Sequence, residues 1–264
     1  MKIVNPETDL PPLDDAAREE IVAFASRQRR ANGLLMRAIN MVGGQVEDTL
    51  KLLPKSARAQ IDNAARAALE RSYQLAARSR GGAVGQRIGT DRAHKVLATL
   101  SGALGGLGGL PTALAELPVA TTVIFRAVQG VAAQYGEDPT SVETRLQCLS
   151  VFGAGARGPG DDGIDTAFFG ARIGLTGAAV HGLIGRVAPR FAAVLSQKLA
   201  TQAVPILGAA AGAGTNYAFT EYYVEIAHVH FGLRRLARTF GEEAVSDAFH
   251  TALAARIKGP LREA

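Results

Sequence analysis

The residues best suited to chemistry lie in the last third of the chain, at helical spacing. Tyr217, Glu221, Glu225 and His228 follow one another at steps of four, four and three, which return to one face of a helix. Glu225 and His228 have the Glu-x-x-His spacing of carboxylate-bridged metal sites, which take matching ligands from other helices. Because the chain holds only one such pair, we predict that this face of the helix is either exposed to solvent or packs against another helix. A metal site at Glu221, Glu225 and His228 is the alternative.

Four other polar residues are candidates for a ligand site or polar pocket: Glu116, Arg126, Asn216 and His230. Glu116 and Arg126 stand in the most apolar part of the chain, where a charge must be paired or face water. The simpler account places Glu116 near a helix start and pairs Arg126 elsewhere. His230 falls inside an apolar seam, which favours a hydrogen-bonded core histidine over a ligand. Asn216 is expected to cap a helix or to bond across a helix contact.

The sequence contains no catalytic motif that would assign the protein to an enzyme class. The stretch 153–158 matches Gly-x-Gly-x-x-Gly, but it follows an apparent helix and leads into Pro159, so it lacks the strand-turn-helix context of a phosphate loop. The single cysteine, Cys148, excludes an intramolecular disulfide and a thiolate metal cluster. We therefore expect no catalytic residues and no cofactor.

The elements that carry these residues are predicted to be helices throughout. A first helix begins at Asp14 or Asp15 and ends near Arg30, before a break at Asn32-Gly33. A second runs from Leu34 to Leu53, and a third begins at Pro54 and ends before Gly81. The last long helix carries an apolar seam with a period near 3.5 residues, made of Phe219, Tyr223, Ile226, His230, Leu233, Ala237 and Phe240. Gly241 is expected to end it, before a final helix over 242–257.

The centre of the chain predicts helical hairpins rich in glycine. Residues 96–110 and 113–135 form the first hairpin, in which Gly102, Gly106 and Gly109 allow two backbones to approach closely. Thr140 to Glu143 has the spacing of a capping box. In the back half, Pro189 is expected to restart a helix, and the uncharged run 199–220, bent at Pro205, forms a second hairpin. We therefore predict an all-α multi-helix bundle with two Gly-rich apolar hairpins.

Charge is distributed unevenly along the chain. The net charge is +5, and residues 18–92 carry 14 Lys and Arg against 7 Asp and Glu, an excess of 7. A basic front next to an apolar centre fits an anionic membrane surface, although a solvated helical surface explains the charge equally well. Residues 1–12 lack the pattern of a secretory signal, so contact with a membrane is expected from the cytoplasm.

Several motifs resemble the EcsC protein family. In the centre they are Gly-Gly-Leu-Pro111, the run from Leu117-Pro118 to Arg126, and Tyr135-Gly-Glu-Asp138; later come the run from Val204-Pro205 to Thr220 and Ala227-His-Val-His-Phe-Gly-Leu-Arg-Arg-Leu236. The resemblance covers residues 93–264. It implies a mostly helical bacterial protein at the inner face of the cytoplasmic membrane, since the family is named for a protein encoded beside an ABC-type exporter.

Together these observations predict a flexible segment at 1–13, a basic amphipathic helical region at 14–92 and an EcsC-like helical core at 93–264, the last two forming one domain. The expected function is that of a non-catalytic accessory protein, peripherally attached to the cytoplasmic face of the membrane. Its expected partners are the anionic membrane surface or membrane transporter subunits, not nucleic acid, and a homo-oligomer is left open. The alternatives are a soluble helical metal- or ligand-binding enzyme, and a structural module whose hairpins bury against a partner protein.

Overall fold

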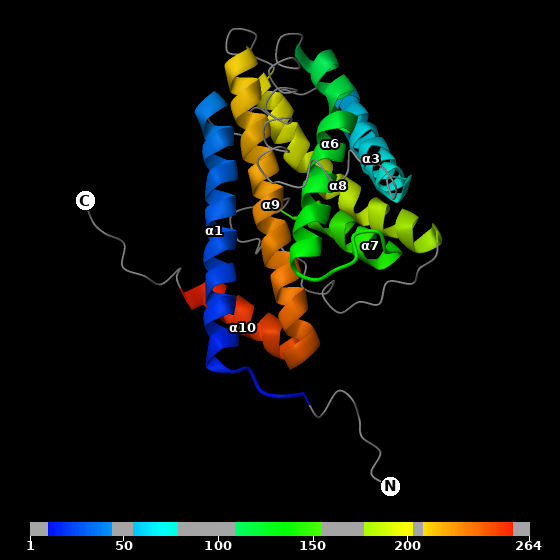
Figure 1. Ribbon diagram of the computed structural model, residues 1–264. Helices are drawn as coiled ribbons and strands as arrows, with labels where there is room; N and C mark the ends of the chain where they lie inside the picture. Colours follow the sequence, from blue (N-terminus) through cyan, green and yellow to red (C-terminus); the bar gives the residue numbers. More distant parts are fainter. Residues whose placement is uncertain (1–9, 44–54, 79–108, 155–176, 203–207, 256–264) are drawn as a thin grey trace, which may run out of the picture.

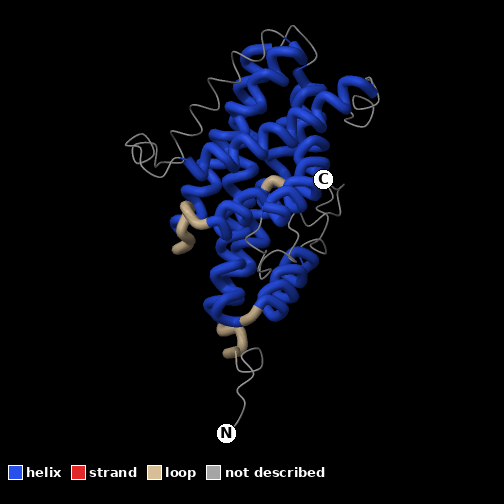
Figure 2. Tube along the Cα trace, turned by 90° about the vertical axis from the view of Figure 1, so that its right-hand side faces the viewer, coloured by secondary structure: helices blue, strands red, loops and turns tan. Residues whose placement is uncertain are grey.

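The fold is described by a computed structural model for residues 10–43, 55–78, 109–154, 177–202 and 208–255. Within these ranges the chain forms seven helices and no strand, which confirms the all-α prediction. The helices are α1 (Asp15–Gly43), α3 (Lys55–Arg78), α6 (Gly109–Gln134), α7 (Val142–Val151), α8 (Gly177–Gln202), α9 (Gly208–Phe240) and α10 (Glu242–Ala255). They pack into an elongated bundle in both views (Figures 1 and 2).

The two longest helices, α1 and α9, lie side by side and antiparallel (Figure 1). Three contacts fix their register. Arg235 pairs with Glu20, the Phe24 ring lies against Gly232, and Arg27 pairs with Glu225. The same face of α1 buries Ile21, Ala25 and Ala31 in the core.

The predicted break at Asn32-Gly33 is wrong, because α1 continues through it to Gly43. A glycine inside a helix costs about 1 kcal/mol relative to alanine. Here the apolar face of α1 that packs on α9 offsets that cost. Asp14 caps the helix as predicted, since its Oδ1 accepts a hydrogen bond of 2.7 Å from the backbone N of Ala17.

A second group of helices, α3, α6 and α8, packs beside this pair, and the short α7 lies across them (Figure 1). The prediction for α3 is confirmed, since it begins directly after Pro54 and ends at Arg78. The Phe152 ring fills the centre of the core, with centroid distances of 5.0 Å to Tyr223 and 5.2 Å to Phe191. Such ring pairs add to the stabilisation by burial alone.

Two prolines lie inside helices, Pro118 in α6 and Pro189 in α8. The prediction that Pro189 restarts a helix is therefore wrong. An internal proline loses one backbone hydrogen bond. In α8 the residues on both sides of the proline are buried, Val187 before it and Phe191 after it, so packing holds the helix together.

The end of α9 agrees with the sequence. Each seam residue from Phe219 to Leu233 is buried, and the last two, Ala237 and Phe240, pack against the core. Gly241 ends the helix with a φ of +90°, a conformation that other residues rarely adopt. The helix α10 then returns along α1, and Arg29 donates hydrogen bonds of 3.3 Å to the carbonyls of Ala252 and Leu253.

The cap of α7 is one residue later than the predicted capping box. Ser141, not Thr140, is the N-cap, and its Oγ accepts a hydrogen bond of 3.0 Å from the backbone N of Thr144. The backbone N of Thr140 donates to Asp138. Glu143 is therefore free of the capping role, and its carboxylate reaches Arg234 on α9.

The Gly-rich hairpins are not shown by this structure. Residues 96–108 of the first arm lie outside the described residues, as do Gly102, Gly106 and the bend at Pro205. The helices that are described contain no segment long and apolar enough to cross a membrane.

Candidate functional site

The polar face of α9 predicted from its spacing lies against α1 and α6. Along it exposure falls from Tyr217, which is 45% exposed, to His228, which is 8% exposed. Glu225 accepts hydrogen bonds of 2.6 and 3.0 Å from Nε and Nη2 of Arg27. This two-point pairing holds the guanidinium and carboxylate in one plane. At Glu225 and His228 the face is thus a second helix-packing surface, whereas Tyr217 is exposed to solvent.

His228 belongs to a group of six side chains that we call the Tyr135 cluster. The hydroxyl of Tyr135, which directly follows α6, lies 3.2 Å from Nδ1 of His228. Burial raises the pKa of Tyr135, so its phenol stays protonated and can donate to this nitrogen. The cluster consists of Phe24, Arg27, Tyr135, Glu225, His228 and Arg235.

The metal alternative receives no support from this arrangement. The Glu225 carboxylate is engaged by Arg27, and Nδ1 of His228 by the hydroxyl of Tyr135. No group of three or more His, Cys, Asp or Glu residues suited to a metal occurs in the described part of the chain. The arrangement instead joins the three helices α1, α6 and α9.

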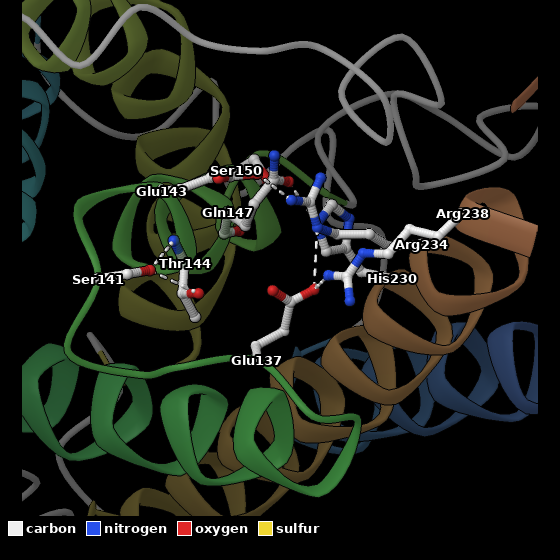
Figure 3. A network of polar contacts seen from close by, with 9 residues as sticks. All are labelled: Glu137, Ser141, Glu143, Thr144, Gln147, Ser150, His230, Arg234 and Arg238. Atoms are coloured by element: carbon white, nitrogen blue, oxygen red, sulfur yellow. Dashed lines mark hydrogen bonds and ion pairs between the residues drawn. The ribbon is translucent and has the colours of Figure 1, made fainter. Parts of the chain in front are cut away.

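A second group, the Arg234 network, lies where α9 meets α7 and the turn before it (Figure 3). Arg234 donates a hydrogen bond of 3.0 Å from Nε to Glu137 and another from Nη2 to Glu143. Arg238 also pairs with Glu137. The side chains of Arg234 and Glu137 are only 8% and 9% exposed, so this ion pair is screened little by water.

His230 completes the Arg234 network from the same helix. Its Nε2 lies 2.8 Å from Oε1 of Gln147, both side chains being buried. Burial first, and the positive charge of Arg234 second, lower the pKa of His230 to about 3. The imidazole is therefore neutral at physiological pH, and with Gln147 Oε1 as acceptor its hydrogen is on Nε2. The interpretation of His230 as a hydrogen-bonded core histidine is confirmed.

Acidification from pH 6.5 toward pH 3 is expected to lower the free energy of unfolding through His230. The unfolded chain protonates this imidazole near pH 6.5, whereas the folded protein does so only near pH 3. Between these values the unfolded state binds more protons, so stability falls by up to about 1.4 kcal/mol per pH unit as pH falls. Above pH 6.5 this residue adds no pH dependence.

Urea unfolding at several pH values measures this slope. The His230→Gln variant keeps a hydrogen-bonding group beside Gln147 and cannot titrate, so its stability should depend less steeply on pH. Equal slopes in the two proteins would contradict the assignment.

The other candidate residues lie on α6 and α9. Arg126 is half-buried in α6 and makes contacts within the fold. Glu116 lies well inside α6, so it is not near the helix start, and Asn216 lies well inside α9, so it does not cap that helix. The side chains of Glu116 and Asn216 are outside the described part of the structure.

Sequence reasoning missed the partners that define the two groups. Glu137 and Arg234 appear only inside motifs quoted for the family resemblance, and Arg27 was assigned to the end of a helix that continues past it. A signal was available for Arg234, which follows the seam residue Leu233 directly on a helix with apolar residues on several sides. A charge at such a position needs a partner.

Fold and site together define a helical protein in which buried ion pairs and hydrogen bonds tie separate helices together. The EcsC protein family matches residues 24–163 and 179–236, and the chain belongs to this family. The matched ranges include Tyr135, Glu137, His230 and Arg234. No curated protein and no solved structure was found to match the chain.

Proposed function

We propose that this chain is a non-catalytic accessory protein that attaches peripherally to the cytoplasmic face of the bacterial membrane, where it serves an ABC-type transport system. The observation that carries the proposal is membership of the EcsC protein family over residues 24–163 and 179–236. The family takes its name from a protein encoded beside an ABC-type exporter. The partners proposed on this basis are anionic lipid and subunits of a membrane transporter.

The geometry of the two polar groups supports a structural use of their side chains. Glu225 on α9 accepts a hydrogen bond from Arg27 on α1. Glu137, in the turn before α7, accepts hydrogen bonds from Arg234 and Arg238 on α9. His230, with a pKa of about 3, is too weakly basic to serve as a general base near neutral pH. These side chains stabilise the packing of α9 against α1, α6 and α7.

Surface charge supports attachment to anionic lipid. Part of the basic excess in residues 18–92 is used inside the fold, by Arg27 and Arg29. Arg18, Arg30, Arg66 and Arg71 are exposed on α1 and α3. Each Lys or Arg close to an anionic membrane contributes about 1 kcal/mol to binding.

Sedimentation with lipid vesicles tests the attachment. We expect the protein to sediment with vesicles containing phosphatidylglycerol and to remain in the supernatant with vesicles of phosphatidylcholine alone. Because exposed charges are screened by salt, binding should weaken strongly between about 0.05 M and about 0.5 M salt. A protein that ignores anionic vesicles at low salt would contradict attachment through lipid.

Native membranes test the transporter partner. Bacterial membranes and vesicles made from lipids extracted from them present the same lipid, but only the membranes present the transporter. We expect tighter binding to the membranes, and the difference should disappear when their proteins are digested beforehand. Equal binding to both preparations would argue against a protein partner.

A further inference from the structure

Two arginines are buried among the described residues, Arg234 at 7% exposure and Arg145 at 5%. Arg145 belongs to α7, which packs against α3 (Figure 1). Glu143 and Gln147 stand two positions before and two positions after Arg145, so their side chains leave the helix on the opposite side, toward α9. Arg145 is therefore separate from the Arg234 network.

The guanidinium of Arg145 is held against an aromatic ring of α3. Its Cζ lies 4.7 Å from the centroid of the Tyr73 ring, which is within the range of a cation–π contact. Its Nε donates a long hydrogen bond of 3.4 Å to the carbonyl of Ser141, which also accepts the helical hydrogen bond from the backbone N of Arg145. The ring and the carbonyl thus hold the guanidinium while using one of its five N–H groups.

The outer edge of the Arg145 guanidinium is unused by the described part of the chain. There, no acceptor bonds to Nη1 or Nη2 and no carboxylate pairs with Arg145, whereas Arg234 pairs with two. Neither nitrogen is among the fully buried polar atoms that lack a partner, so both keep contact with solvent. A buried charge without a counter-charge costs free energy that a cation–π contact offsets only in part. Proteins accept such a cost mainly at functional sites.

The start of α7 adds positive potential beside Arg145. The helix begins at Val142, one turn earlier, and a helix N-terminus is equivalent to about half a positive charge. The Glu143 carboxylate of this first turn pairs with Arg234 on the other side of the helix. The guanidinium and the helix start therefore both favour an anion on the α3 side of α7.

The facing surface of α3 carries one charge of each sign. Arg66 and Glu70 share the face of α3 that holds Tyr73, because steps of seven and three residues return to nearly the same direction. Arg66 is exposed, whereas Glu70 is half-buried and forms no ion pair with Arg145. These two charges offset each other, so the guanidinium and the start of α7 determine the sign of the site.

We propose that Arg145 binds one phosphate group through Nη1 and Nη2 where α7 meets α3. A flat guanidinium presents paired N–H donors that match two oxygens of a phosphate or a carboxylate. Phosphate is favoured, because it carries between one and two negative charges, against about one and a half positive charges at the site. The site goes beyond the proposed membrane attachment and does not depend on it. Its phosphate comes either from a lipid headgroup or from solution.

Calorimetric titration with inorganic phosphate, at an ionic strength held constant with chloride, tests the site. We expect the natural protein to bind phosphate and Arg145→Met to bind it about 10- to 100-fold more weakly, since hydrogen bonds between charged groups are lost. Arg145→Lys keeps the charge but loses the paired donors, and should weaken binding about tenfold. The matched control Arg66→Gln removes an exposed arginine and should weaken binding less than about fivefold. Equal affinities of Arg145→Met and the natural protein would overturn the proposal.

Tyr73 is a positioning residue in this proposal, because it acts through Arg145. Tyr73→Leu removes the cation–π contact and should weaken phosphate binding about two- to fivefold. Tyr73→Phe keeps the ring and should bind phosphate as the natural protein does. Equal affinities of these two variants would show that the ring does not hold the guanidinium for binding.

Stability in buffer without phosphate separates a binding site from an internal ion pair. Removing one partner of a buried ion pair destabilises a protein strongly, whereas replacing a residue kept for function often leaves it equally or more stable. Arg145→Met retains the apolar stem, so we expect its urea midpoint to be at least that of the natural protein. A clearly lower midpoint would show that Arg145 serves the fold instead of a ligand.

Vesicles identify the source of the phosphate. If the source is a lipid headgroup, Arg145→Met should sediment less with phosphatidylglycerol vesicles, and inorganic phosphate should release the natural protein from them at constant ionic strength. If the source is free phosphate, Arg145→Met should sediment as the natural protein does. Both results support the site.

The measurements also separate this site from the proposed function. A protein that binds inorganic phosphate through Arg145 but no vesicle contradicts membrane attachment and leaves the site intact. A protein that binds vesicles equally well with Arg145→Met, and that binds phosphate no better than chloride, keeps the attachment and overturns the site.

Discussion

Replacing Glu137 by Gln is expected to lower the free energy of unfolding by about 3–5 kcal/mol, the range found when one partner of a buried ion pair is removed. The Glu137 carboxylate accepts from both Arg234 and Arg238, and the Arg234 side chain is 8% exposed. Neutral Gln leaves the Arg234 charge in a poorly solvated position with Glu143 as its remaining carboxylate. Denaturant unfolding of the purified variant measures the loss.

Two variants serve as controls for this prediction. Arg238→Gln removes the exposed partner of Glu137 and should cost less than about 1 kcal/mol. Glu243→Gln changes an exposed carboxylate of α10 and should stay within about 0.5 kcal/mol of the natural protein. A Glu137→Gln variant as stable as Arg238→Gln would show that burial of this pair does not matter to the fold.

Replacing Gly232 by Ala is expected to destabilise the protein by about 1–3 kcal/mol, the usual cost of overpacking a core. A Cβ at Gly232 would stand 2.1 Å from Cζ of Phe24 and within 2.7 Å of two further ring atoms. The ring is buried between α1 and α9 and packs against Tyr135, so it cannot move aside freely. Thermal or denaturant unfolding measures the change.

A Gly→Ala substitution at a position with free space should raise the stability of the protein instead of lowering it. Gly130 lies on α6 with nothing within 4 Å of its would-be Cβ, so Gly130→Ala should stabilise the protein by up to about 1 kcal/mol through helix propensity.

Combining Gly232→Ala with Phe24→Leu shortens the obstructing side chain, and the double variant should lose less stability than the sum of the two single variants. Additive losses would mean that Phe24 is not the obstacle.

The sequence predicted the elements whose signals are local. The seam of α9, its end at Gly241, the cap at Asp14 and the start of α3 after Pro54 all follow from periodicity or from residues a few positions away. Gly33 and Pro189 each disfavour a helix locally, but tertiary packing outweighs that preference: Ala31 is buried just before Gly33, and Val187 and Phe191 are buried on either side of Pro189. Propensity is a weak guide wherever tertiary packing opposes it.

In the candidate site, too, local sequence patterns predicted some features, whereas others depend on residues far apart in the chain. The face of Glu225 and His228 was predicted from spacing, but its partner Arg27 stands 198 residues earlier, and nothing in a single sequence connects them. Close helix contact was predicted from the spacing of Gly102, Gly106 and Gly109, of which the first two lie outside the described residues. In the structure a close helix contact occurs at Gly232, a glycine without that spacing. The Phe24 ring of α1 occupies the space that a Cβ at this position would need.

The pairing of α1 with α9 has a consequence for how the chain folds during synthesis. The apolar face of α1, with Ile21, Phe24 and Ala25, is covered by a helix that leaves the ribosome some two hundred residues later. Contacts so distant along the chain slow folding, since a large loop must close before they form. Until α9 emerges, the apolar face of α1 is exposed to chaperones and to neighbouring nascent chains.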